Sequence, residues 1–225
     1  MVLEAVKQYG LALGFAAKPL RTDRKVICAA VTQNIRILQY ATEREVVIAV
    51  VKVRGGALRY APTAFRNDRE VVLAAVKKDG DVLEYASETL KNDREVVLAA
   101  VKKDGHVLRH ASNTLKNDRE VVLAAVKRCG YAIHYPSDTL KNDREVVLAA
   151  VNQYGPYVLQ RAPDTLKNDR EVVLAAVKQN GAALRYASET LKNDREVVLA
   201  AVGRRGCALG YASETLKNDC AVVLK

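Results

Sequence analysis

Apolar and polar positions follow one another along this chain in a block that recurs with little change. Polar residues open the block and an apolar run closes it, which is typical of a helix that starts at a polar cap and packs its apolar side chains. Self-similarity at a fixed spacing predicts a repeat architecture. The block NDREVVLAAV starts at Asn67, Asn92, Asn117, Asn142, Asn168 and Asn193, and a degraded copy follows Asn218.

The ends of the helix in each block can be predicted from the copy at Asn92. We expect Asn92 to be the N-cap and Glu95 to complete a capping box. Gly105 is expected to stop the helix in a left-handed conformation. The run 96–101 is apolar on every side. A helix of this kind is buried all round, so we predict an inner helix flanked by its copies.

A second, shorter helix is expected after each inner helix. Leu83, Ala86 and Leu90 stand at i, i+3 and i+7, the one-sided pattern of a surface helix. The polar segment 87–89 is expected to mark the end of this helix. Each unit is therefore predicted to be a helical hairpin of about 12 plus about 8 residues with tight connections.

The spacing of the units predicts the architecture of residues 1–225. One unit buries too little apolar surface to offset the cost of ordering its backbone, about 1–2 kcal/mol per residue, so units must stack. We predict an all-α protein, a single α-solenoid or superhelix of about nine stacked 25-residue helix-turn-helix repeats, and expect it to be right-handed. Both ends fall in mid-helix, so we expect part of a longer array or an array docked at both ends. The apolar runs end at Val6, Val31, Val51, Val76, Val101, Val126, Val151, Val177 and Val202.

Two irregularities interrupt the spacing. The step from Val31 to Val51 is five residues short, and Thr42 with Glu45 is expected to supply a capping box there. The segment 154–157 adds one residue, and its proline is expected in the first turn of the outer helix. Either irregularity could hold a ligand or be a tolerated local change.

Composition limits the compartment and excludes a membrane span. The four cysteines show no paired spacing, which indicates a reducing compartment. The start of the sequence lacks the basic region and uninterrupted apolar run of a signal peptide. No apolar stretch approaches the roughly 20 residues of a membrane helix. We therefore expect an intracellular, soluble protein, with the organelle left open.

The unit LKNDREVVLAAVKxxGxALxYASxxL, about 25 residues long, resembles a family of tandem short helical-hairpin repeats of unknown function. The resemblance covers nearly the whole chain and is most specific over residues 65–216. Upstream units depart from it, because Lys25 replaces the acidic residue and Ile35 replaces the turn glycine. The resemblance implies tandem helical hairpins and no particular chemistry.

The copies differ mainly at the end of the inner helix and in the first turn of the outer one. These positions share one edge of the predicted stack and supply much of the net charge of +10. Solenoids commonly bind partners on an extended variable surface. Drift at solvated positions is the alternative. The candidate partner-binding edge comprises Lys77, Lys78, Lys102, Lys103, Lys127, Arg128, Gln153, Tyr154, Lys178, Gln179, Arg204 and Arg205.

The outer helices carry an aromatic residue at one equivalent position in most copies, with His110 and Arg161 as replacements. The replacements indicate a half-buried position at which the polar end of the side chain contacts water. A packing ladder is the main interpretation, and a base-stacking ladder is the alternative.

Three function classes follow from these features. The first is a non-enzymatic scaffold or accessory subunit that binds protein partners, possibly acidic ones, or joins a larger assembly. The second is nucleic-acid binding, in which the basic edge neutralises phosphates with strong salt dependence. The third is an enzyme, but the sequence shows no Ser–His–Asp set, glycine-rich phosphate loop or isolated carboxylate pair. We therefore expect no catalytic residues and no cofactor.

His106 and His110 are four apart but lack a convincing third ligand, so no metal site is predicted.

Overall fold

The computed structural model describes residues 1–21 and 23–223. Within these residues every regular element is a helix, and no strand is present. The all-α prediction is thus confirmed. The chain divides into two compact units, Met1–Leu115 and Lys116–Lys225, which are described separately below.

Most repeats contain three helices rather than the two predicted; the short-spaced repeat, in which α4 follows η2 directly, lacks the third. In one repeat, α6 (Arg69–Lys78) is followed by a six-residue 3-10 helix, η4 (Gly80–Tyr85), and by the short α7 (Glu88–Lys91). Ser87 lies between the last two and caps α7, since its Oγ accepts a hydrogen bond from the Leu90 N–H at 3.4 Å. The predicted outer helix ending at 87–89 was therefore wrong: this polar segment starts a helix.

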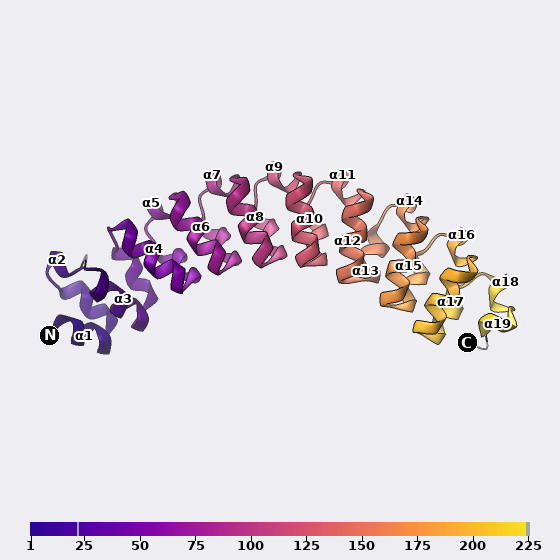
Figure 1. Ribbon diagram of the computed structural model, residues 1–225, viewed down its shortest axis with the longest axis horizontal. Helices are drawn as coiled ribbons and strands as arrows, with labels where there is room; N and C mark the ends of the chain where they lie inside the picture. The colour runs from indigo at the N-terminus through magenta and orange to yellow at the C-terminus, as the bar shows by residue number, and fades with distance from the viewer. Residues whose placement is uncertain (22, 224–225) are drawn as a thin grey trace. The chain divides into compact units, whose positions relative to one another are not determined.

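In the first unit, each long helix packs against the next one along the chain, from α1 through α3, α4 and α6 to α8. The 3-10 helices form a second row in the same order. In Figure 1 the short helices α5 and α7 follow one edge of this unit. The remaining elements are α1 (Val2–Gln8), η1 (Gly10–Phe15), α2 (Lys18–Arg21), α3 (Arg24–Gln33), η2 (Ile35–Tyr40), α4 (Arg44–Val53), η3 (Gly55–Tyr60), α5 (Thr63–Arg66), α8 (Arg94–Lys103), η5 (Gly105–His110) and α9 (Asn113–Lys116).

The second unit repeats this arrangement. Its long helices pack in the order α10, α12, α15, α17 and α19. The predicted stacking of near-identical repeats is thus observed within each unit. The elements are α10 (Arg119–Arg128), η6 (Gly130–His134), α11 (Asp138–Lys141), α12 (Arg144–Tyr154), α13 (Pro156–Arg161), α14 (Asp164–Lys167), α15 (Arg170–Gln179), η7 (Gly181–Tyr186), α16 (Glu189–Lys192), α17 (Arg195–Arg204), η8 (Gly206–Tyr211), α18 (Glu214–Lys217) and α19 (Cys220–Val223).

The core is a row of valine, alanine and leucine side chains from the long and 3-10 helices. In α8, Val97, Ala100 and Val101 are fully buried, as is Leu108 of η5. The fifth residue of α8, Leu98, is only half-buried, and so is the alanine that follows it. The expectation of burial on every side was wrong, because stacked neighbours and the 3-10 row leave one face of each long helix uncovered.

The N-cap of each long helix lies one residue later than predicted. Asp93 caps α8, since its Oδ1 accepts from the Val96 N–H at 3.0 Å. Asn92 instead ends α7. Asn and Asp are nearly equal as N-caps, so the choice depends on where the preceding short helix ends. In the short-spaced repeat Glu43 precedes α4 without a side-chain cap bond, so the capping box expected there is also absent.

In five repeats the glycine after the long helix serves close packing rather than a left-handed stop: Gly10, Gly55, Gly80, Gly130 and Gly181. Gly155 is the only residue with positive φ in the part of the chain that the structure describes. Gly80 opens η4, and a Cβ added to it would lie 2.7 Å from the Ala100 carbonyl oxygen of the next repeat. The left-handed stop was therefore a wrong prediction, and this position needs glycine because neighbouring backbones approach so closely.

Candidate functional site

The uncovered faces of six long helices carry a glutamate and a Leu-Ala pair, and four of them also carry a lysine. In α8, helical spacing places Glu95, Ala99 and Lys102 on one face beside the half-buried Leu98. The half-buried Leu-Ala pairs recur in six repeats. They are Leu73–Ala74, Leu98–Ala99, Leu123–Ala124, Leu148–Ala149, Leu174–Ala175 and Leu199–Ala200.

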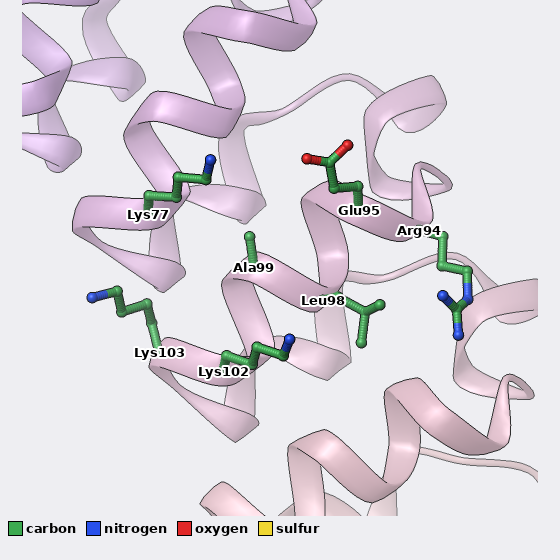
Figure 2. A pocket seen from close by; sticks show the side chains of 7 residues that line it. All are labelled: Lys77, Arg94, Glu95, Leu98, Ala99, Lys102 and Lys103. Carbon is green, nitrogen blue, oxygen red and sulfur yellow. The ribbon is translucent and has the colours of Figure 1, made fainter.

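Between α6 and α8 this face forms a groove of about 600 Å³. Figure 2 shows Lys77 extending from α6 on the side of Glu95 and Ala99, while Arg94 and Lys103 extend to opposite sides of α8. The groove thus has an apolar floor and a basic border. Its lining residues are Lys77, Arg94, Glu95, Leu98, Ala99, Lys102 and Lys103.

Equivalent grooves occur elsewhere with different borders. Between α12 and α15, Leu148, Leu174 and Ala175 line a groove of about 370 Å³ that has Lys178 on its border. Asn152 replaces the preceding lysine there, and the Gln179 amide donates to its carbonyl oxygen at 3.4 Å. Between α3 and α4 the groove is smaller, about 100 Å³, and mostly apolar, with Cys28, Val31, Thr32, Ala49, Val50, Val53 and Arg54 around it. The floor is therefore apolar in all three grooves, whereas the border varies.

The structure distributes the twelve residues of the predicted edge unevenly. All twelve are exposed and lie at or just after the ends of long helices. Lys77, Lys102 and Lys103 line one groove, and Lys178 and Gln179 line another. Lys78, Lys127, Arg128, Gln153, Arg204 and Arg205 line none of the three grooves above, and Tyr154 belongs to an aromatic cluster described below.

In six of the long helices an arginine binds carboxylates at the start of the next, and sequence reasoning missed these contacts. Arg144 donates from Nε to Asp169 at 2.5 Å and from Nη2 to Glu171 at 2.6 Å. The same aspartate caps its own helix through the Glu171 and Val172 N–H groups. We call this series the arginine ladder. Its other described members are Arg44 with Asp68 and Glu70, Arg69 with Asp93 and Glu95, Arg119 with Asp143 and Glu145, Arg170 with Asp194 and Glu196, and Arg195 with Asp219.

The ladder changes the electrostatics of the grooves. The Arg144 guanidinium holds the pKa of the Asp169 carboxyl below its ordinary value, and partial burial opposes that effect. Arg69 likewise binds Glu95 on the border of the first groove, so that carboxylate is balanced. The lysines Lys77 and Lys102 form no ion pair within the described residues and give the groove its net positive charge.

A second series of contacts joins the opposite edge of the stack. The Ser87 hydroxyl donates to the Asn67 side-chain oxygen at 2.7 Å, and its N–H donates to the Arg66 carbonyl oxygen at 3.0 Å. Ser112, Ser188 and Ser213 make the same pair of bonds to the preceding repeat. The Asn, Asp, Arg, Glu and Ser positions of the repeat are therefore structural.

A metal ion needs several ligand side chains gathered around one point. Within residues 1–21 and 23–223, no three His, Cys, Asp or Glu side chains gather in a geometry suited to a metal ion. His110 instead accepts a hydrogen bond from the Arg109 Nε at 2.8 Å. Among the helices described, none combines the length and apolar character needed to cross a bilayer.

These observations define an all-α tandem-repeat protein whose repeats are joined by polar contacts at two edges. The family whose profile matches the chain is described as Domain of unknown function (DUF4116), and it matches residues 1–44, 43–91, 93–141, 118–167, 143–192, 169–217 and 194–225. The chain belongs to this family, which confirms the resemblance found from the repeat sequence. No curated protein and no solved structure matches the chain.

Proposed function

We propose that the chain is a non-enzymatic scaffold that binds an acidic, amphipathic segment of a protein partner in the grooves between successive long helices. The observation that carries this proposal is the groove between α6 and α8, where Leu98 and Ala99 form an apolar floor beside Lys77 and Lys102. An aliphatic face on the partner would cover the floor, and carboxylates beside it would meet the lysines. This combination of apolar floor and charged border resembles known helix-in-groove recognition.

Nucleic-acid binding is the second candidate, and the unpaired lysines favour it. Lys77, Lys102 and Lys178 would neutralise phosphates, and the affinity of the protein for nucleic acid would fall steeply with salt. The apolar floor argues against it, because half-buried Leu98 offers nothing to a phosphate backbone. Glu95 on the border, although balanced by Arg69, also places carboxylate oxygens where phosphates would lie.

The absence of enzymatic activity is part of the proposal. The polar residues that recur in the six NDREVVLAAV blocks already serve as caps and as contacts between repeats. A catalytic set would have to come from positions at which the copies differ.

The experiment selects binders of the whole protein from a display library of random 16-residue peptides at 150 mM salt. We expect the enriched peptides to combine Asp or Glu with aliphatic residues at helical spacing. The affinity of one such peptide is then measured by fluorescence anisotropy against Lys77→Glu/Lys102→Glu and against Leu98→Gln. Both variants should weaken binding at least tenfold, since each removes one component of the groove.

The matched control is Lys18→Glu/Lys25→Glu in the same unit. It changes the charge by the same amount and installs the residues found at the equivalent positions Glu88 and Glu95. This control should bind within twofold of the parent. Enriched peptides without acidic residues, or equal affinity for the groove variant and the control, would refute the proposal. Binding of a 20-nucleotide single strand that the lysine variant loses and Leu98→Gln keeps would establish the second candidate instead.

A further inference from the structure

The second unit contains a site at which the repeat pattern breaks. Helix α12 runs to Tyr154, one residue longer than the other long helices of the NDREVVLAAV blocks. Gly155 then turns the chain with φ of +62°, and Pro156 opens α13, an α-helix where the other repeats have a 3-10 helix. The placement of the proline in the first turn is as predicted. The inserted turn brings Tyr154 and Tyr157 beside η6 of the preceding repeat.

Five aromatic rings meet at this break, one of them Tyr135, which lies 6.1 Å from Tyr131. The ring of Tyr131 lies 4.5 Å from His134 and 5.8 Å from Tyr154, both edge-on, and Tyr154 lies 5.5 Å from Tyr157. The Tyr157 side chain is 62% exposed, which leaves ring surface open to a flat ligand. Aromatic rings stack on planar groups of many kinds, so this cluster is suited to a ring-bearing molecule.

The rings border two adjoining cavities. One, of about 260 Å³, is lined by Tyr131, His134, Tyr154, Tyr157, Gln160 and Arg161. The other, of about 180 Å³, has His134 and Arg161 in common with it and adds an apolar wall from Ile133, Val147, Val158 and Ala162, with Lys141 at its edge. Together they reach the size of small-molecule pockets, which begin at about 300 Å³.

The charge of this site is positive. Arg161 stands where the equivalent residues of the preceding and following repeats are Tyr135 and Tyr186, and it has no ion-pair partner among the residues that the structure describes. Neither cavity has an acidic residue among its described lining residues. The pKa of His134 is lowered by burial and by the nearby Arg161 and Lys141. Lys141 is partly balanced by Asp138 at 3.3 Å, which leaves Arg161 as the main uncompensated cation.

We infer that this cluster binds a small phosphate ester that carries a planar heteroaromatic ring, of the nucleoside monophosphate class. The ring would stack on Tyr157 and Tyr154, and the guanidinium fork of Arg161 would hold the phosphate oxygens, an interaction that matches its planar geometry. This site differs from the grooves of the proposed scaffold, and neither depends on the other.

The experiment measures binding of adenosine 5′-monophosphate, adenosine and inorganic phosphate to the whole protein by isothermal titration calorimetry. We expect the monophosphate to bind, and each of its two parts to bind at least tenfold more weakly. Arg161→Tyr restores the residue of neighbouring repeats and should preserve the fold by circular dichroism while weakening the monophosphate at least tenfold. Tyr157→Ala should weaken it as well.

The control is Arg185→Gln, which removes the same charge and installs the residue present at the equivalent position Gln160. Its affinity should stay within twofold of the parent. A second readout is the pKa of His134 followed by NMR, which a bound phosphate should raise. Three results would each overturn the inference: no binding of the monophosphate, equal affinity in Arg161→Tyr, or phosphate alone binding as tightly as the monophosphate.

Discussion

Replacing Gly181 with alanine tests how closely successive repeats pack. A Cβ built on Gly181 would lie 2.2 Å from the Ala201 carbonyl oxygen and 3.1 Å from its carbonyl carbon. Both atoms belong to the backbone of α17, so no side-chain rotation can relieve the contact. The Ala201 oxygen also accepts the Arg205 N–H at 2.9 Å, so the strain falls on the end of that helix.

The magnitude follows from the displacement that is needed. An ordinary carbon contact requires about 3.5 Å, so the two repeats must separate by about 1.3 Å at this point. Forcing an extra methyl into a well-packed site costs about 1–3 kcal/mol. For a chain of this length a loss of 2 kcal/mol lowers the thermal midpoint by about 4–8 °C.

Circular dichroism at 222 nm gives the midpoint, and amide exchange locates the change. We expect Gly181→Ala to melt earlier and to speed exchange of the Arg205 amide. The matched control is Gly203→Ala: Gly203 lies in α17, is exposed and has no atom within 4 Å of an added Cβ. Alanine there should raise stability by about 0.5–1 kcal/mol through backbone entropy. A midpoint for Gly181→Ala equal to or above that of the parent would refute the close-packing argument.

Three further outcomes are expected. Asp169→Ala should lower the free energy of unfolding by about 1 kcal/mol, because it removes an N-cap, and Asp169→Asn should lose less, which urea unfolding can measure. Hydrogen bonds from Arg119 and Arg144 lower the pKa of the Asp143 and Asp169 carboxyls from an ordinary 3.8. The ionised carboxylates therefore stabilise the folded protein above that pH, and this stabilisation is lost as pH falls through the lowered pKa. The thermal midpoint should therefore drop below about pH 4, and a flat profile would contradict this. Arg161→Tyr should raise the pKa of His134 in an NMR titration, since Arg161 is one of the cations that lower it; burial, the larger cause, would remain.

Much of the fold could be predicted because the same pattern of apolar and polar residues recurs in each repeat. The apolar run located the long helices and the buried Val97, Ala100 and Val101. The helix ends were less certain. Two adjacent residues, Asn92 and Asp93, are both good caps, and only the short helix before them decides between the two.

The contacts between repeats could not be derived from one repeat alone. That Arg144 reaches Asp169 depends on the register between neighbours, which hydrophobic spacing does not fix. A signal was nevertheless present: an identical Asp-Arg-Glu triplet in the six NDREVVLAAV blocks suggests that one triplet meets the next. The cluster around Tyr131 and Arg161 was partly visible as an insertion and a replaced tyrosine, but the meeting of its rings was not.

The ladder also accounts for which positions vary. A triplet inside a unit, such as 169–171, has a partner on both sides, because its Asp and Glu receive Arg144 of the previous repeat while Arg170 reaches Asp194 and Glu196 of the next. A change in one triplet therefore disturbs two junctions. The last junction shows the consequence: Ala221 stands where Glu would be, and Arg195 reaches only Asp219, at 3.3 Å, within the described residues. Residues bound in this way on both sides cannot readily acquire a ligand, whereas groove borders and the break at Gly155 can. Ligand recognition in this protein should therefore be sought where the copies differ.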